Sequence, residues 1–222
     1  MFRPLGRGLR DTLDNLLPFI LASFGWWASV LLIVTAPAGT ITLFACADPR
    51  RLSEHLRPAR AELAAEFCRE LLRGWILALA FAVPVLVLVN NLRVYTNSDG
   101  PVRWLAPLWI LLILLAVTAG GIAVSLRAVH ARKIGSAIRL AVMIALGRAH
   151  LLLPVMVILW VIVAIGGVLV VPALMFVPPL VAVTFNHVTY DALGISLDDP
   201  LEPTPERLAE EARARGGKYS VG

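Results

Sequence analysis

The stretch LLLPVMVILWVIVAIGGVLVVPALMFVPPLVAVTFNHVTY, residues 151–190, contains no Asp, Glu, Lys or Arg in forty positions. As a single helix it would be about 60 Å long, twice the roughly 30 Å thickness of the hydrocarbon core of a bilayer. The stretch therefore predicts two membrane helices folded into a hairpin. Gly166, Gly167 and Pro172 interrupt it near the middle, so we expect the tip of the hairpin near residues 167–172.

The composition of the whole chain also indicates a membrane protein. Hydrophobic residues make up 59% of its 222 residues and the mean hydropathy is +0.80, whereas soluble domains are about 45–50% apolar. The net charge of +5 is modest. The only two cysteines, Cys46 and Cys68, imply no disulfide framework. We therefore expect one polytopic membrane domain over residues 1–195, followed by a cytoplasmic tail with a short helix over residues 196–222.

Three further apolar segments are candidates for membrane helices. Residues 74–92, with Pro84 inside, and residues 104–126 each have the length of one membrane span. Residues 16–47 are uncharged but contain Pro37, so we expect this segment to enter the membrane, break at Pro37 and return through a short second helix near residues 38–47.

Two charged segments predict amphipathic helices that lie at the membrane surface. Residues 1–17 place leucines at helical spacing, with Arg10 and Asp14 on the other side. In residues 48–73 one face is apolar and the other carries acids, and we expect the members of this acidic face to be Glu62, Glu66 and Glu70.

The distribution of basic residues predicts the topology. The N-terminus, residues 48–73 and residues 127–148 hold three, six and five basic residues, whereas the tip of the last hairpin holds none. Basic segments favour the cytoplasmic face. All three lie on that face if the chain forms a bundle of about six membrane helices, the second one short, with both termini cytoplasmic. Five spans is the alternative.

The sequence offers little catalytic chemistry. It has no Gly-rich phosphate loop, no HExxH, no CxxC and no Gly-x-Ser-x-Gly motif, so we expect no enzyme, no cofactor and no bound metal. No acid or base lies inside a predicted span, which argues against ion-coupled transport. The candidates for a polar pathway or for partner contacts are Asn90, Asn91, Thr118, Asn186 and His187. Hydrogen bonding between helices is the simpler role for these residues, and an interfacial anchor is the simpler role for His187.

The segment 127–148 carries basic residues and no acid. These residues are candidates for binding anionic lipid headgroups or an acidic partner, although holding a loop on the cytoplasmic side would also explain them; they are Arg127, Arg132, Lys133, Arg139 and Arg148. Nucleic-acid binding is not expected, because the basic residues follow the membrane entry points.

A small-residue face in the segment 104–126 predicts close helix packing or a partner surface. This face comprises Ala116, Gly120, Gly121, Val124 and Ser125.

Over most of residues 10–195 the chain resembles the YesL-like family of small bacterial membrane proteins of unknown function. The resemblance rests on four places: Asn15-Leu16-Leu17, the run IVTAPAGT at residues 33–40, Phe67 with residues 69–75, and residues 137–146. The family pattern places Gly before the proline, whereas this chain has Ala36 there and Gly39 after it. The resemblance implies an integral protein of the cytoplasmic membrane, often found with carbohydrate-uptake systems, and it implies no catalytic residues.

Two functions remain open from these observations. The first is a non-enzymatic membrane accessory that binds membrane lipids and a second membrane protein, such as a carbohydrate ABC-type permease. The second is a small transporter or channel that works alone or as a homo-oligomer. An intramembrane enzyme is a third reading, and its only motivation is His187 near Asp191.

Overall fold

The structure, a computed structural model, describes residues 3–53, 60–98, 101–168 and 170–195, and within these ranges it contains helices and turns but no strand. The predicted all-α class is confirmed for these residues. The predicted tail, residues 196–222, lies outside them. The helices are α1 (Arg3–Asp14), α2 (Leu16–Leu31), α3 (Ala36–Cys46), α4 (Pro49–Ser53), α5 (Arg60–Thr96), the 3-10 helix η1 (Pro101–Leu105), α6 (Ala106–Ala128), α7 (Ile134–Gly147), α8 (Ala149–Val168) and α9 (Val170–Leu193).

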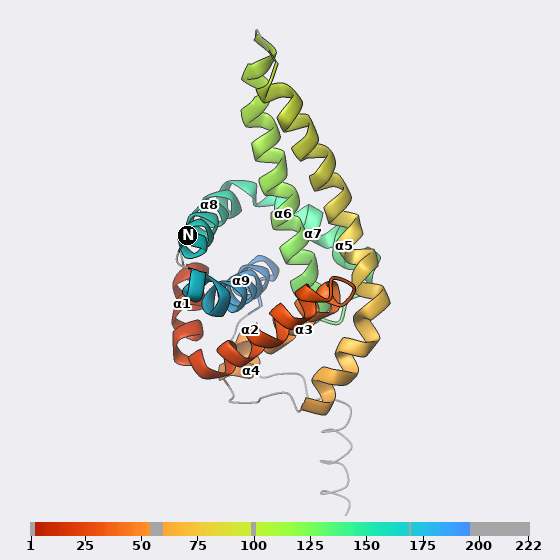
Figure 1. Ribbon diagram of the computed structural model, residues 1–222, viewed down its shortest axis with the longest axis vertical. Helices are drawn as coiled ribbons and strands as arrows, with labels where there is room; N and C mark the ends of the chain where they lie inside the picture. The colour runs from red at the N-terminus through yellow and green to blue at the C-terminus, as the bar shows by residue number, and fades with distance from the viewer. Residues whose placement is uncertain (1–2, 54–59, 99–100, 169, 196–222) are drawn as a thin grey trace, which may run out of the picture.

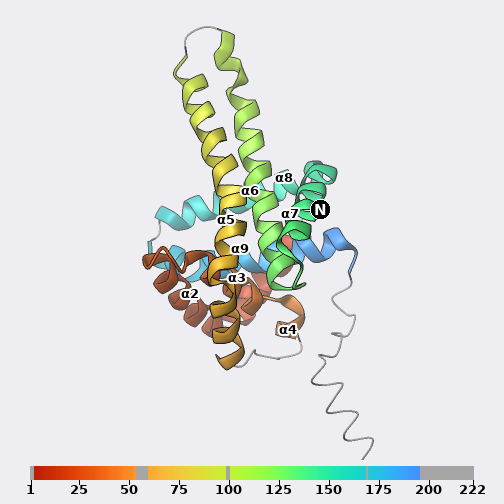
Figure 2. The same cartoon turned by 90° about the vertical axis from the view of Figure 1, so that its right-hand side faces the viewer.

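Helices α5 and α6 form a long antiparallel hairpin, and its distal half projects beyond all the other described helices (Figures 1 and 2). Residues 63–96 and 103–128 are long and apolar enough to cross a membrane. These two spans contain the predicted segments 74–92 and 104–126. Pro84 lies within α5, which continues through it. Such a proline is tolerated in membrane helices because neighbouring groups satisfy the freed carbonyl.

The predicted six-span bundle is not confirmed. Among the described residues, only α5 and α6 contain by themselves a segment that is both long and apolar enough to cross a membrane, and a third span results only if α7 and α8 count as one bent unit. The bend between these two helices is 96°. Helices α8 and α9 also lie across the direction of α5 and α6, so the segment 151–190 does not run as two spans beside them (Figure 2). Helix α8 is described as far as Val168 and α9 from Val170, and residue 169, within the predicted tip at residues 167–172, lies outside the described residues.

The segment 16–47 folds back on itself earlier than expected. Helix α2 ends at Leu31, and Pro37 lies in the first turn of α3 rather than at the break. Pro is favoured there because the first N–H groups of a helix need no intrahelical acceptor. With 16 and 11 residues, α2 and α3 are both shorter than the roughly 20 residues that a span needs. The turn between them passes through Ile33, whose φ is +49°.

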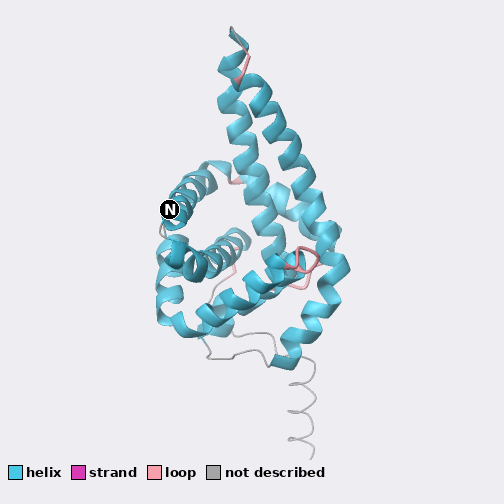
Figure 3. Ribbon diagram, viewed as in Figure 1, coloured by secondary structure: helices cyan, strands magenta, loops and turns pink. Residues whose placement is uncertain are grey.

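Helix α9 lies at the centre of the described fold. It contacts α1, α2, α3, α4, α6 and α8, and Figure 3 shows helices packed around it on several sides. Ala182 and Val183 of α9 are fully buried among Ile122 and Leu126 of α6. Gly121 allows α6 to approach closely, because a Cβ at this position would lie 2.3 Å from the ring of Phe185. The predicted small-residue face thus packs inside the molecule.

Helix α1, which corresponds to the first predicted amphipathic helix, has one exposed side and one side that packs against α9. Leu9 and Leu13 of α1 are exposed, as a lipid-facing side requires. The opposite side contacts α9, and there Gly8 lies against Thr184. Helix α1 therefore joins the core of the fold through its small and polar side.

Candidate functional site

Asn186 is fully buried on α9 and connects it to α3 and α6. Its Nδ2 donates hydrogen bonds to the carbonyl oxygens of Phe44 and Ala47, both at 2.9 Å. Its Oδ1 accepts a hydrogen bond of 2.7 Å from the Ser125 hydroxyl. Both N–H groups and the oxygen of this amide are therefore used inside the protein, at the point where α3 ends and its last carbonyls need donors.

His187 connects α9 to α1. Its side chain is buried, and Nε2 donates to Oδ2 of Asp11 at 2.7 Å. One turn before Asp11, Gly8 approaches Thr184 so closely that a Cβ would lie 2.8 Å from the Thr184 hydroxyl oxygen. His187 is therefore not the interfacial anchor that its position in the sequence favoured, because α9 runs through the core and α1 covers this side of it.

Tyr190 and Asp48 form a third polar contact on α9. The Tyr190 hydroxyl donates to Oδ1 of Asp48 at 2.9 Å, and the backbone N–H of Arg50 donates to the same oxygen at 3.1 Å. The Arg51 guanidinium lies 3.7 Å from the other carboxylate oxygen. Burial nevertheless raises the pKa of the Asp48 carboxyl, because removal from water outweighs these hydrogen bonds and charges.

His130, in the loop after α6, lies beside the same tyrosine. Its ring packs edge-on against Tyr190 with centroids 5.2 Å apart, and the Arg50 guanidinium lies 5.1 Å from the Tyr190 ring centroid. Burial lowers the pKa of His130, and the charges of Arg132 and Arg50 lower it further. This cluster therefore favours a neutral imidazole next to an array of arginines.

Glu70 and Arg127 form a buried ion pair between α5 and α6. The Arg127 guanidinium donates to both carboxylate oxygens, from Nη2 to Oε1 and from Nε to Oε2, the latter at 3.1 Å. Its Nη1 donates to the Arg132 carbonyl. The sequence predicts Glu70 on the acidic face of an amphipathic helix, and the structure buries this side chain against α6, with only 1% of it exposed.

The predicted pathway residues do not come together. Asn90 is exposed and Asn91 is half-buried, and both belong to the C-terminal half of α5. Thr118 is buried on α6, and its hydroxyl donates to the Leu114 carbonyl of its own helix at 2.6 Å. Asn186 and His187 are also buried, but their partners are Ser125, the end of α3 and Asp11.

The predicted headgroup contacts separate into three groups. Arg127 is occupied by Glu70. Arg132, Lys133 and Arg139 are exposed. Arg148 is half-buried at the junction of α7 and α8, where it lines a pocket.

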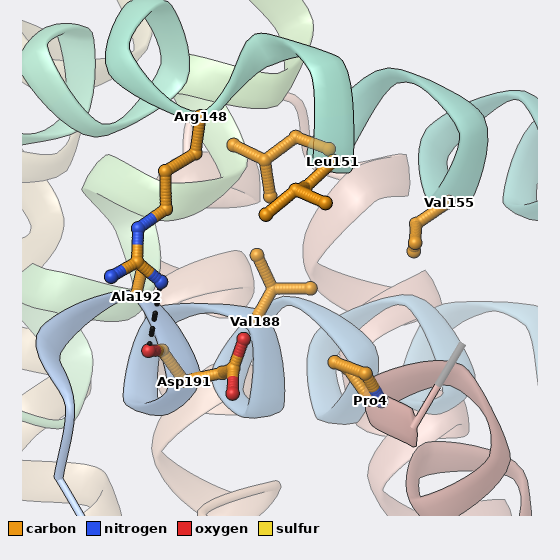
Figure 4. Close-up of a pocket in the computed structure, with 8 residues that line it drawn as sticks. Pro4, Arg148, Leu151, Val155, Val188, Asp191 and Ala192 are labelled. Carbon is orange, nitrogen blue, oxygen red and sulfur yellow. Dashed lines mark hydrogen bonds between the residues drawn. The ribbon is translucent and has the colours of Figure 1, made fainter. Parts of the chain in front are cut away.

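This pocket, with a volume of about 400 Å³, lies between α8, α9 and the start of α1. Figure 4 shows Arg148, in the turn between α7 and α8, extending toward α9, where Nη1 donates to the backbone carbonyl of Asp191 at 3.0 Å. The Asp191 side chain lies next to Val188 in the same view. The walls of the pocket are otherwise apolar, and its full lining is Pro4, Arg148, Leu151, Leu152, Val155, Val188, Asp191 and Ala192.

Three acids that matter for this region were not among the predicted site residues. Asp11, Asp48 and Glu70 lie in segments that the sequence assigns to the membrane surface, yet each binds a polar side chain on α6 or α9. Their pairing partners are between 57 and 176 residues away in the chain. No local sequence pattern predicts pairs that are so far apart in the chain. The only sequence signal for these three acids is that they flank the apolar segments.

Comparisons of the chain with protein-family models, with curated proteins and with solved structures found no match. The resemblance to the YesL-like family therefore stays a prediction. Among the residues that the structure describes, no group of three or more His, Cys, Asp or Glu side chains is placed to hold a metal ion.

Proposed function

We propose that this chain is a non-enzymatic, multi-pass accessory protein of the cytoplasmic membrane, and that the distal half of its α5–α6 hairpin binds a second membrane protein. The observation that carries the proposal is the projection of this hairpin beyond the other described helices (Figure 1). Large apolar side chains are exposed along its distal half, among them Leu86, Val87, Val94, Leu108 and Ile110.

The distal half also exposes a polar group to which lipid acyl chains offer no hydrogen-bond partner. Asn90 presents an amide, and amides in hydrocarbon are costly unless they are hydrogen-bonded. Tyr95 of α5 and Trp109 of α6 pack with their rings 5.3 Å apart, which holds the two helices together near the tip. A rigid apolar hairpin with an amide on it fits a helix of another membrane protein as its partner.

The charge distribution supports an orientation with both termini cytoplasmic. The proximal end of the hairpin carries Arg69 and Arg73 on α5 and is followed by Arg132 and Lys133 after α6, whereas the distal end carries only Arg93 and Arg103. The positive-inside rule then places the proximal end in the cytoplasm. Two crossings by α5 and α6 return the chain to the side from which it started.

The resemblance to the YesL-like family extends the proposal to a partner class, a permease of the carbohydrate ABC type. The competing function, a transporter or channel that acts alone, requires polar groups along a pathway. Asn186 would be central to such a pathway, but its amide is hydrogen-bonded to α3 and α6. The accessory role needs no such pathway.

Affinity purification from native membranes in a mild detergent tests the proposal. Wild type should recover a permease-type partner in stoichiometric amount. The double variant Leu86→Trp, Val94→Trp should reduce recovery about tenfold, as expected when bulk disrupts well-packed interface side chains. Met143→Trp, at an exposed apolar position on α7, is the matched control and should recover wild-type amounts. Equal recovery by both variants, or purification of a monomer alone that supports solute flux in proteoliposomes, would contradict the proposal.

A further inference from the structure

The pocket between α8, α9 and the start of α1 plays no part in the proposed accessory role. Its volume of about 400 Å³ lies in the range of about 300–1,000 Å³ that is typical of small-molecule sites. It carries two side chains of opposite charge, Arg148 and Asp191, on an otherwise apolar lining.

The two charges are available to a ligand. In the described part of the chain, Arg148 makes one hydrogen bond with its guanidinium, to the main-chain carbonyl of Asp191. Four of its five N–H donors thus have no protein acceptor there. The Asp191 side chain is exposed and takes part in no ion pair or hydrogen bond among the described residues. Because Arg148 binds the carbonyl and not the carboxylate, the pocket offers a cation and an anion side by side.

The pocket is charged at one end and apolar at the other. Leu151, Leu152 and Val155 follow Arg148 along α8. Leu151 is itself partly exposed, and Val161 and Ile165, further along the adjoining side of the same helix, expose large apolar surfaces. The site therefore changes from charged at the start of α8 to apolar along its length, which is the polarity of a phospholipid lying against the helix.

We propose that this pocket binds the headgroup of phosphatidylethanolamine. Arg148 would bind the phosphate and Asp191 the primary ammonium, while the acyl chains cover the exposed apolar side of α8. Anionic lipids such as phosphatidylglycerol fit less well because they supply no cation for Asp191. The trimethylammonium group of phosphatidylcholine carries the charge but has no N–H to donate to the carboxylate.

Native mass spectrometry of delipidated protein, titrated in detergent with phosphatidylethanolamine, phosphatidylglycerol or phosphatidylcholine, tests this assignment. Wild type should retain phosphatidylethanolamine most tightly. Arg148→Gln should weaken its binding about tenfold, because charge-assisted hydrogen bonds to phosphate are lost. Asp191→Asn should abolish the preference over phosphatidylglycerol. Asp191→Asn leaves the hydrogen bond between Arg148 and the main-chain carbonyl of residue 191 in place. A change in lipid preference in this variant therefore reports on headgroup recognition and not on a folding defect.

Arg139→Gln is the matched control, because Arg139 is an exposed basic residue of the same segment that does not line the pocket. It should bind like wild type. The assignment is overturned if Asp191→Asn keeps the wild-type preference, if Arg139→Gln weakens binding as much as Arg148→Gln, or if water-soluble glycerophosphoethanolamine competes as well as the lipid. The result is independent of the purification experiment above, since lipid retention needs no protein partner.

Discussion

Glu70, near the start of α5, and Arg127, near the end of α6, form a buried two-point ion pair that fastens the proximal ends of the α5–α6 hairpin to each other. Breaking a buried pair by neutralising one partner leaves the other charge uncompensated, which costs about 3–5 kcal/mol. We expect Glu70→Gln to lower the free energy of unfolding by this amount in mixed detergent micelles.

The surface pair Arg10–Asp14, at 3.6 Å with both side chains largely exposed, provides the control. Asp14→Asn should change the free energy of unfolding by about 1 kcal/mol or less, because exposed pairs contribute little. Similar effects of Glu70→Gln and Asp14→Asn on the free energy of unfolding would contradict the buried position of the Glu70–Arg127 pair.

Two neighbouring glycines on α6 should respond differently to alanine. A Cβ on Gly121 would lie 2.3–2.6 Å from the Phe185 ring, which is itself buried, whereas a Cβ on Gly120 would lie at an ordinary 3.4–3.7 Å from Phe81. Gly121→Ala should destabilise the protein by about 1–3 kcal/mol through overpacking, and Gly120→Ala should destabilise it less. Thermal unfolding in detergent measures both, and the reverse order would place α9 on another side of α6.

Asp48 should make stability depend on pH. Burial raises its pKa above the ordinary value of 3.8, so the folded protein binds this proton more tightly than the unfolded chain. The stabilisation from this group is complete below pH 3.8 and is lost as the pH rises through the raised pKa. Wild type should therefore lose stability relative to Asp48→Asn as the pH is brought from acidic to neutral. A difference between the two proteins that stays constant, or that changes in the opposite direction, would contradict the buried position of Asp48.

The turn between α2 and α3 should lie in hydrocarbon. Leu31, Leu32, Ile33 and Val34 are each 67–80% exposed, and the Val34 carbonyl accepts a hydrogen bond of 2.7 Å from the Trp75 indole. Ile33 has a positive φ, which a β-branched residue adopts only at a cost. The presence of Ile at a turn where Gly would be unstrained fits a side chain that contacts lipid.

A nitroxide label tests this position of the turn. In vesicles, a label at Leu32→Cys should relax faster with oxygen than with a water-soluble nickel reagent, because oxygen partitions into the acyl chains. The label at Ser136→Cys, on the exposed start of α7, should show the opposite preference. Both labels need Cys46 and Cys68 replaced. A nickel preference at Leu32 would place the turn in water.

The helical class and the two spans of the α5–α6 hairpin could be predicted because one local pattern dominates there. The spans in α5 and α6 follow from uniform apolar runs of sufficient length. The turn after α2 was misplaced because it occurs at Leu32 and Ile33, which carry no turn signal, rather than at Pro37. Helical periodicity predicts the acidic face that holds Glu70, but the pattern of one helix does not report that Arg127 of another helix covers this residue.

The same limit applies to the candidate site. Asn186 and His187 were recognised as unusual polar residues in an apolar segment, and this local observation was sufficient to single them out. Their partners Ser125 and Asp11 are 61 and 176 residues away, and only the three-dimensional arrangement identifies them. The pocket at Arg148 likewise requires Asp191, which approaches it only because α9 folds back beneath α8.

Site-specific photo-crosslinking in native membranes tests the central claim, that the distal α5–α6 hairpin binds a second membrane protein, most directly. A benzophenone amino acid replaces Leu86 on the distal hairpin or, as the control, Met143 on α7, both of which are exposed apolar positions. The account predicts one discrete adduct with a permease-type membrane protein from position 86 and none from position 143. Adducts with lipid alone from position 86, or the same protein adduct from both positions, would contradict it.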